Sequence, residues 1–567
     1  MNSNWFLYNK KKNVEEITQK FGINPLTSVI LCNREIYEED DIRKILSSDL
    51  RDLNDEKLLP DVDAAVKILN KYIGEGKRIR IVGDYDIDGV CSTYILYDSI
   101  KRLGANISYD IPDRVSDGYG INISIIDKAK DDKVDLIITC DNGIAAKDQI
   151  AYAKKNNIEV IVTDHHDITE LPKDASAIVD PKRDDVEKVY PFGGICGAVV
   201  AWKLMMRYYE LYKKDRDFII DNYLEYATLA TIGDIMPLIN ENHIIAKLGL
   251  KKMAKTKNLG LQKLLEVTGI DFSTKDVTTY HVGFIIGPLI NAAGRMDKAT
   301  LALKLFLSND TKEVAEIAEE LKKLNDERKL MTENGTKLAI ESIERYYKDN
   351  KVIVVYVDGL GEQVAGIVAG RIKEKYNKPS IVLTDTASAD EAKASCRSIE
   401  EYDIFEALSK HKEIFLKFGG HKLAAGFSIL KKDIDELRLS LNKECCLSDD
   451  DFIPKVHIDA EFPFYSFDLK LLSEIEKIEP FGQAFQKPVF ATREVKCNIK
   501  NIYGADNNIV QLILNKDGKV SKAVAFTDSE VLKARLETSD VLDIIYTPKI
   551  NEFRGVKSID IAVSEFR

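Results

Sequence analysis

The chain has 567 residues, too many for one hydrophobic core, so we expect about two to four domains. Its composition, 45% hydrophobic and 31% charged, excludes a disordered chain, and no apolar run approaches the roughly 18 residues that span a bilayer. The net charge of -12 argues against a protein that coats nucleic acid through bulk electrostatics, so a nucleic-acid ligand would need a local basic groove. The N-terminal residues lack the basic and apolar segments of a signal peptide. We therefore expect a cytoplasmic, multidomain protein that contacts no membrane.

The 8 cysteines are scattered along the chain and form no C-x-x-C pair. Such a pair would have indicated a zinc site or a redox dithiol. We therefore expect buried free thiols.

An alternation of short β-prone runs with helical runs extends from about residue 71 to residue 179 and predicts β-α-β units with a parallel sheet. Four of the predicted strands end in aspartate, at Asp84, Asp141, Asp164 and Asp180. One such aspartate is most often a turn residue or a helix N-cap. Because ligands of open parallel sheets bind beyond the carboxyl ends of the strands, four in succession favour a functional site in one crevice.

Three acids lie together in "GDYDIDG", at Asp84, Asp86 and Asp88. Close carboxylates raise one another's pKa unless a positive charge sits among them, so a cation is expected. The pattern D-x-D-x-D-G also begins a calcium loop of the EF-hand type, but the twelfth position of that loop requires Glu and is Ile95 here. The acids more plausibly follow a buried strand.

Imidazoles join these acids in "TDHHD", at His165 and His166, and "ATIGDIMPL" adds Asp234. Mixed carboxylate and imidazole ligation fits manganese, with iron, cobalt or zinc as alternatives. Several carboxylates with one or two histidines are what a two-metal phosphodiester site requires. Asp141, at the end of the central strand, is the candidate for the carboxylate that bridges two ions.

The rest of the chain is predicted to contain a helical region, a second β-α-β unit and a C-terminal β-rich region. Residues 194–350 are mostly helical, and in the last long helix Val314, Ile317, Leu321 and Leu324 keep helical spacing. A second β-α-β unit begins at residue 351 and continues to about residue 430. Beyond about residue 450 the pattern alternates as in strands and predicts a small all-β barrel.

The second unit contains "FGGHKLAAG", in which two glycines precede His421. We expect the amides of Gly419 and Gly420 to approach a phosphate closely before a helix starts. Taken alone, the segment would be a packing turn. With Ser395 and Arg397 in "SCRS" and Arg295 in "NAAGR", a phosphate cradle is favoured. The nearby lysines would form a solvated face by default and would otherwise extend a basic path, at Lys410, Lys412, Lys417 and Lys422.

The motifs "DYDIDG", "CDNG", "TDHH" and "TIGDIMPL", in this order and spacing, resemble the DHH phosphoesterase superfamily. "GFIIGPLINAAGRM", "AKASCRS" and "FGGHKLAAGFSI" resemble the linker and the DHH-associated domain of the RecJ family of bacterial single-strand-specific exonucleases. The resemblance implies an α/β fold with five parts. These are an N-terminal extension at 1–60, a parallel-sheet DHH catalytic domain at 61–240, a helical connector at 241–349, a second α/β, DHH-associated domain at 350–432, and a C-terminal OB-fold barrel at 450–567.

The resemblance also implies residue roles. Asp86 and Asp88 would bind different ions, Asp141 would bridge them, and His165 and Asp234 would complete the shell of the second ion. Asp84 stands where related phosphoesterases place a histidine ligand, so it would complete or orient the shell of the first ion. His166 would contact the scissile phosphate, or else act as an imidazole behind the ligands. The implied substrate contacts, near the cut and at the terminal phosphate, are Arg295, Ser395, Arg397, Gly419, Gly420 and His421.

The activity that the resemblance implies is a 5′-to-3′ exonuclease with two Mn²⁺ ions, or Mg²⁺, that degrades single-stranded DNA to mononucleotides in recombination and repair. Single-strand-binding protein and a helicase are the implied protein partners. The alternative in the superfamily is a phosphodiesterase for short oligonucleotides or cyclic dinucleotides, which generally lacks an OB-like module. A non-catalytic scaffold and a polyphosphate-cleaving enzyme rank lower. One departure from the family pattern is "QAFQ", where Ala484 and Phe485 replace a pair that usually ends in Asn. We expect Phe485 to be buried, and the alternatives are an adjusted turn or a base stacked on Phe485.

Overall fold

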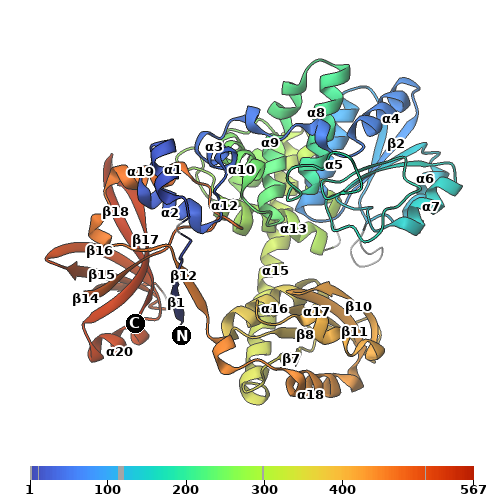
Figure 1. The fold of residues 1–567 in the computed structure, drawn as a ribbon. Helices are drawn as coiled ribbons and strands as arrows, with labels where there is room; N and C mark the ends of the chain where they lie inside the picture. Colours follow the sequence, from blue (N-terminus) through green and yellow to red (C-terminus); the bar gives the residue numbers. More distant parts are fainter. Residues whose placement is uncertain (1–2, 11, 113–119, 297–298, 505, 554) are drawn as a thin grey trace. The chain divides into compact units, whose positions relative to one another are not determined.

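The computed structural model describes residues 3–10, 12–112, 120–296, 299–504, 506–553 and 555–567 (Figure 1). The chain forms two compact units. One unit contains residues 288–302 and 312–455, and the other contains residues 5–287, 303–311 and 456–567. Among the described residues, no helix is long and apolar enough to cross a membrane.

The larger unit begins with a strand and three short helices and continues into a five-stranded parallel sheet. The N-terminal elements are β1 (Asn4–Leu7), α1 (Val14–Phe21), α2 (Pro25–Asn33) and α3 (Glu39–Ser47). In spatial order the sheet consists of β3 (Asn106–Asp110), β2 (Arg78–Val82), β4 (Leu136–Cys140), β5 (Glu159–Thr163) and β6 (Ala177–Val179). The helices around it are α4 (Val62–Gly74), α5 (Ile87–Lys101), α6 (Ile123–Asp131), α7 (Lys147–Lys155), α8 (Gly197–Tyr212) and α9 (Arg216–Gly233).

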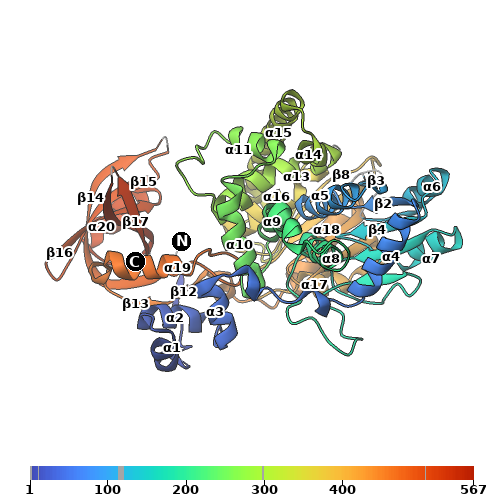
Figure 2. The same cartoon turned by 90° about the horizontal axis from the view of Figure 1, so that it is seen from above.

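The sheet is covered on both faces. The central strand β4, with the sequence LIITC, is buried along its whole length, as expected for a parallel sheet between two helical layers. Helices α5 and α8 pack on one face and α6 and α7 on the other (Figure 2). This arrangement confirms the predicted α/β domain with a parallel sheet.

The strand order places a topological switch point between β2 and β4, because the chain leaves β2 toward β3 and returns to the other side of β2. Ligands of such sheets bind in the crevice at that point, beyond the carboxyl ends of the strands. Asp84 follows β2 and Asp141 follows β4. The two acids that were predicted to face one crevice therefore flank the switch point.

The connector is helical, as predicted. Its helices are α10 (Asn240–Met253), α11 (Leu259–Glu266), α12 (Thr279–His281), a π-helical turn η3 (Val282–Ile286), α13 (Gly287–Arg295), α14 (Ala299–Leu307) and α15 (Thr311–Tyr346). The four apolar residues of α15 that were identified by their spacing are all buried.

The smaller unit contains a five-stranded mixed sheet in the order β10-β11-β9-β8-β7. Its elements are β7 (Ile353–Tyr356), α16 (Glu362–Tyr376), β8 (Ser380–Asp385), β9 (Glu391–Arg397), α17 (Ile404–Ser409), β10 (Phe415–His421), β11 (Ala424–Leu430) and α18 (Ile434–Glu444). The expectation that a helix follows Gly419 and Gly420 is wrong, because both lie in β10, which turns back through Lys422 and Leu423 into β11. The alternating burial of β11 provides the physical reason, since a period of two buries Ala425, Phe427 and Ile429 only in a strand.

The C-terminal part of the larger unit is a closed β-barrel, as predicted for an OB fold. It is preceded by β12 (Lys455–Ile458), which pairs with β1 in a separate two-stranded sheet. The elements of the barrel region are β13 (Ala460–Glu461), α19 (Leu469–Lys477), β14 (Phe490–Tyr503), β15 (Ile509–Lys516), β16 (Lys519–Phe526), α20 (Ser529–Thr538), β17 (Val541–Phe553) and β18 (Val556–Phe566). Strand β14 pairs with both β15 and β17, which closes the barrel. Phe485 is fully buried, as predicted, and the cysteines are free thiols, buried except for Cys446.

Candidate metal centre

Two adjacent clusters of possible metal ligands lie at the carboxyl edge of the parallel sheet. The first cluster consists of Asp84, Asp86 and Asp141, and one ligand atom from each lies within 4.8 Å of the others. The second cluster consists of Asp88, His165 and Asp234 and meets the same limit. A further group of Asp141, His165 and His166 overlaps both. The structure thus brings together all the residues that the sequence identified as candidate ligands.

Asp141 is the residue that links the two clusters. Its Oδ1 lies 3.1 Å from Nε2 of His165, while Oδ2 of Asp88 and Oδ2 of Asp234 lie 3.5 Å and 3.8 Å from the same nitrogen. Three carboxylate oxygens therefore converge on one imidazole nitrogen. That geometry fits the predicted role of Asp141 as a shared ligand.

Burial makes these carboxylates difficult to ionise without a cation. Burial and the charge of Asp86 raise the pKa of Asp84 to about 8, and burial and the charge of Asp88 raise the pKa of Asp234 to about 8. Burial, and next the charge of Asp88, raise the pKa of Asp141 well above its usual range. Oδ1 of Asp84 is buried and has no hydrogen-bond partner among the described residues. A divalent cation would bind this unpaired oxygen and stabilise the ionised form of the neighbouring carboxylates, which otherwise repel one another.

His165 is suited to bind a metal ion because burial lowers its pKa and so keeps the imidazole neutral. Oxygen ligands with one neutral imidazole fit Mn²⁺, and the carboxylates alone also fit Mg²⁺. The donor set therefore fits divalent ions of this class.

The local backbone explains why these side chains point inward. Asp86 is the N-cap of α5 and accepts hydrogen bonds from the amides of Asp88 and Gly89, at 2.9 Å and 3.1 Å. Asp88 lies in the first turn of α5 and accepts hydrogen bonds from the amides of Gly197 and Ala198, both at 2.7 Å. These two amides belong to the first turn of α8, so the positive end of that helix holds the carboxylate.

Asp141 has a left-handed backbone with φ of 61°, which is uncommon outside glycine and is concentrated at functional sites. Its neighbour on α8 has to be small, because a methyl group on Gly197 would lie 2.8 Å from Cβ of Asp141. Gly197 and Ala198 were missed by the sequence analysis. The only signal in the sequence was a glycine at the start of an apolar helical run.

His166 is held by an acid that is not in either cluster. Its Nδ1 lies 2.7 Å from Oδ1 of the buried Asp164, and 46% of the His166 side chain is exposed. Burial opposes protonation of His166, but the hydrogen bond to Asp164 and the charges of the nearby carboxylates together outweigh it and raise the pKa of His166 to about 9. Burial would raise the pKa of Asp164, but His166 and the amide of Ile144 lower it. The pair presents a positive imidazole next to the clusters.

The candidate substrate residues of the smaller unit share one face of its sheet. Strand β11 lies between β9 and β10 and pairs Gly426 with both Ser395 and Gly419, and Ala424 with both Arg397 and His421. Residues directly opposite one another, and residues two apart on a strand, point to the same face. Ser395, Arg397, Gly419 and His421 therefore form one polar surface.

Arg295 belongs to the same surroundings, because its Nη1 donates a hydrogen bond to the carbonyl oxygen of Gln363, in the first turn of α16. A methyl group on Gly366 of α16 would lie 3.2 Å from Nη2 of Arg397. Gly420 is next to Gly419 in β10, and the contact of its backbone amide with a phosphate stays a prediction. With φ of 150° and Ala425 close by, it is required for the turn of the chain.

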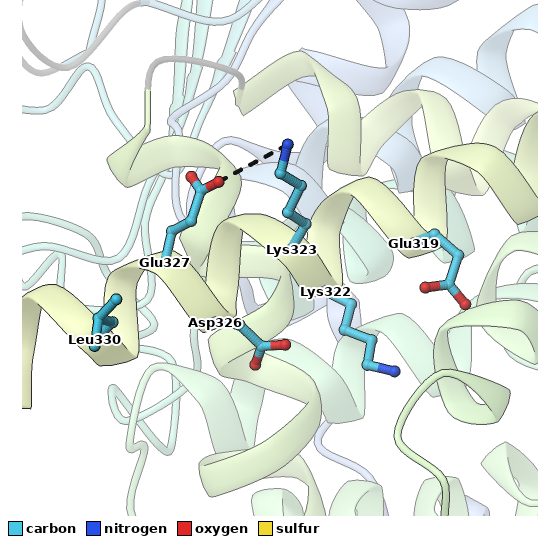
Figure 3. Close-up of a pocket in the computed structure, with 6 residues that line it drawn as sticks. All are labelled: Glu319, Lys322, Lys323, Asp326, Glu327 and Leu330. Atoms are coloured by element: carbon cyan, nitrogen blue, oxygen red, sulfur yellow. Dashed lines mark ion pairs between the residues drawn. The ribbon is translucent and has the colours of Figure 1, made fainter.

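A hollow beside α15 is a different kind of surface (Figure 3). Its lining consists of Glu319, Lys322, Lys323, Asp326, Glu327 and Leu330, all on one helix. Lys323 and Glu327 form an exposed ion pair at 4.0 Å. Alternating charges along one helix are typical of a solvated face, so we assign no ligand to this hollow.

The comparisons with known proteins agree with this architecture. Residues 78–233 match the family model "DHH family, N-terminal domain", residues 349–445 match "DHHA1 domain", and residues 458–565 match "RecJ OB domain". A parallel sheet that gathers two carboxylate clusters at its switch point, in a chain with these three domains, defines a DHH phosphoesterase.

A single-stranded-DNA-specific exonuclease RecJ from Bacillus subtilis (strain 168) is 34% identical over 98% of this chain and 70% of that protein. The chain belongs to the RecJ family. A crystal structure of RecJ in complex with Mn²⁺ from Thermus thermophilus has the same fold, with a TM-score of 0.81 and 24% identity over 100% of this chain and 79% of that one. A crystal structure of exonuclease RecJ bound to manganese is 30% identical over 69% of this chain and 96% of that one, with a TM-score of 0.59. A divalent metal site is therefore part of the family to which this chain belongs.

Proposed function

We propose that this protein is a divalent-metal-dependent exonuclease that degrades single-stranded DNA from its 5′ end and releases mononucleotides. The observation that carries the proposal is the pair of ligand clusters that Asp141 links through its contact with His165, in a chain that also has the RecJ OB domain. The relative from Bacillus subtilis is named a single-stranded-DNA-specific exonuclease. We further propose recombination and repair in the cytoplasm as its setting, with single-strand-binding protein and a helicase as partners.

We assign one ion to Asp84, Asp86 and Asp141, and a second ion to Asp88, Asp141, His165 and Asp234. Mn²⁺ is the proposed ion because imidazole is in the ligand set, and Mg²⁺ is the alternative. Two such ions, when bound, supply a water of lowered pKa and offset the negative charge of the reacting phosphate.

The protein's own groups have separate tasks in this proposal. The α8 amides hold Asp88 in place, and the buried Asp164 keeps His166 protonated and oriented. A protonated His166 can donate a hydrogen bond to a non-bridging phosphate oxygen, where negative charge develops during hydrolysis. Asp164 thus acts as a positioning residue, and His166 as the catalytic residue that touches substrate.

We propose that the polar surface of Ser395, Arg397 and His421, with Arg295 nearby, holds a terminal phosphate and the nucleotide near the cut. Arginine and hydroxyl donors suit phosphate oxygens, and Lys417 lies on the same face of β10. A site for a terminal phosphate would give the enzyme its polarity, because only one end of the strand carries a 5′-phosphate.

The competing function, hydrolysis of short oligonucleotides or cyclic dinucleotides, is less favoured because those substrates need no OB domain. A substrate panel with Mn²⁺ tests the proposal, using a single strand of about 30 nucleotides, the same sequence as blunt duplex, a dinucleotide and a cyclic dinucleotide. We expect the long single strand to be degraded and the duplex to survive. Cleavage of the dinucleotides with an intact long strand would refute the proposal.

A further inference from the structure

Ile235 is a strained and exposed residue next to the second cluster. It follows Asp234 directly, has φ of 57° and leaves 70% of its surface in solvent. A β-branched side chain in the left-handed region is a genuine outlier, because its Cβ substituents collide with the backbone. An exposed isoleucine gains nothing from burial that would offset this strain. Strain of this kind is found where a side chain is needed for function.

A pair of exposed aromatic rings lies on the connector of the same unit. Tyr280 in α12 and Phe284 in the π-helical turn η3 are 61% and 72% exposed, and their rings stack with centroids 5.2 Å apart. Thr279 fixes this segment by donating a hydrogen bond to the carbonyl oxygen of Phe481 at 2.9 Å. π-helical turns are frequent at functional sites, and contiguous exposed apolar surface marks interaction sites.

The two segments meet at one residue of the metal loop, Ile87, which lies between Asp86 and Asp88 and is buried. A methyl group on Gly233, just before Asp234, would lie 2.7 Å from Cγ2 of Ile87. A methyl group on Gly287, just after η3, would lie 3.5 Å from Cδ1 of the same side chain. The glycine two positions before Ile235 and the glycine that follows η3 therefore pack against the same side chain of the metal loop.

We infer that Ile235, Tyr280 and Phe284, here called the apolar strip, contact the nucleosides next to the scissile phosphate. This inference rests on the proposed function and adds the residues that position the strand. Stacking of a base on an aromatic face tolerates any sequence, because every base has a π face. The exposed, branched side chain of Ile235 would make an apolar contact with a deoxyribose or a base edge beside the hydrolysed bond.

The test combines protein variants with missing bases. KM and kcat are measured with Mn²⁺ for 5′-phosphorylated single strands that carry one abasic position, placed in turn at each of the first six nucleotides. We expect Phe284→Ala to raise KM about 5- to 150-fold on intact DNA, the range that corresponds to loss of one base–aromatic stack. At one abasic position the wild-type KM should rise by a similar factor, and the variant should show no further rise there. Tyr346→Ala, which removes an aromatic ring that is 63% exposed on α15, should follow the wild type.

Ile235→Gly provides a second readout, because it relieves the strain. We expect its thermal midpoint to equal or exceed that of the wild type, while its KM rises and its Mn²⁺ affinity is unchanged. The inference would be overturned if every abasic position raised the KM of Phe284→Ala by the same factor as it raises the wild-type KM. It would also be overturned if Phe284→Ala and Ile235→Gly both had the wild-type KM on intact DNA. Loss of Mn²⁺ binding in Ile235→Gly would also overturn it, because the residue would then act on the metal centre. A wild-type protein that leaves single-stranded DNA intact would instead refute the proposed function, and the inference with it.

Discussion

Binding of a divalent ion should release protons from this protein at neutral pH. Burial raises the pKa of Asp84 and of Asp234 to about 8, so about nine-tenths of each carboxyl group is protonated at pH 7 without metal. A carboxyl group must lose its proton before it can bind a metal ion. Because burial also raises the pKa of Asp141 well above its usual range, filling both clusters should release about two or more protons per chain at pH 7, and fewer as the pH rises above about 8.

The number of protons can be measured by titration calorimetry. Mn²⁺ is added to chelated and dialysed protein at pH 7 in three buffers of different ionisation enthalpy, and the slope of the observed enthalpy against that enthalpy gives the protons released. Asp84→Asn removes one of the titrating groups and should lower the slope by about half to one proton. A slope near zero at pH 7 in the wild type would refute the reasoning, because the carboxylates would then be ionised before the metal arrives.

The raised pKa of Asp84 also determines how the stability of the metal-free protein changes with pH. The folded pKa of Asp84 lies above its unfolded value of 3.8, so its favourable contribution is complete below pH 3.8 and is lost as pH rises toward about 8. One such group lowers the free energy of unfolding by up to about 1.4 kcal/mol per pH unit in that window. Mn²⁺ should therefore raise the thermal midpoint more at pH 8 than at pH 6. An equal rise at both values would contradict the assignment of these carboxyls to the metal centre.

Three further predictions concern a close packing contact, a strained backbone and the proposed contact with the terminal phosphate. Gly197→Ala places a methyl group 2.8 Å from Cβ of Asp141, so we expect the free energy of unfolding to fall by about 1–3 kcal/mol and Mn²⁺ binding, measured by calorimetry, to weaken. The control is Gly193→Ala, whose added methyl group has its nearest contact at 3.4 Å and should change neither quantity. Ala484→Gly relieves a φ of 61° and should stabilise the protein by about 0.5–1 kcal/mol in thermal unfolding, and a loss of stability would contradict this. Arg397→Ala should abolish most of the preference for 5′-phosphorylated over 5′-hydroxyl single strands, about tenfold or more in kcat/KM, and an unchanged ratio would exclude a terminal-phosphate contact.

The sequence was sufficient to predict the parallel sheet and the ligands at its edge, because both depend on local patterns. An aspartate after each of several buried strands gathers at one edge whatever the packing of the helices, so Asp84, Asp141 and Asp164 could be grouped without coordinates. The pairing of Asp164 with His166 was not predicted, because the two residues occur in a motif where either histidine could face the acid.

Contacts between distant parts of the chain were the ones that could not be predicted. The amides of α8 that hold Asp88 lie more than a hundred positions along the chain, and an amide carries no sequence signal of its own. The incorrect prediction of a helix after Gly420 has a similar cause. Glycines before a small-residue run fit a phosphate loop or a hairpin, and only the alternating burial of β11 against the core decides between them.

The most direct test of the central claim uses one DNA strand labelled at either end. The purified protein is incubated with Mn²⁺ and a single strand of about 30 nucleotides labelled at its 5′ or its 3′ end, beside Asp141→Asn, in which asparagine tolerates the left-handed backbone. We predict immediate release of the 5′ label as a mononucleotide, gradual shortening of the 3′-labelled strand, and no product with the variant. Immediate release of the 3′ label, or equal cleavage by Asp141→Asn, would contradict the account.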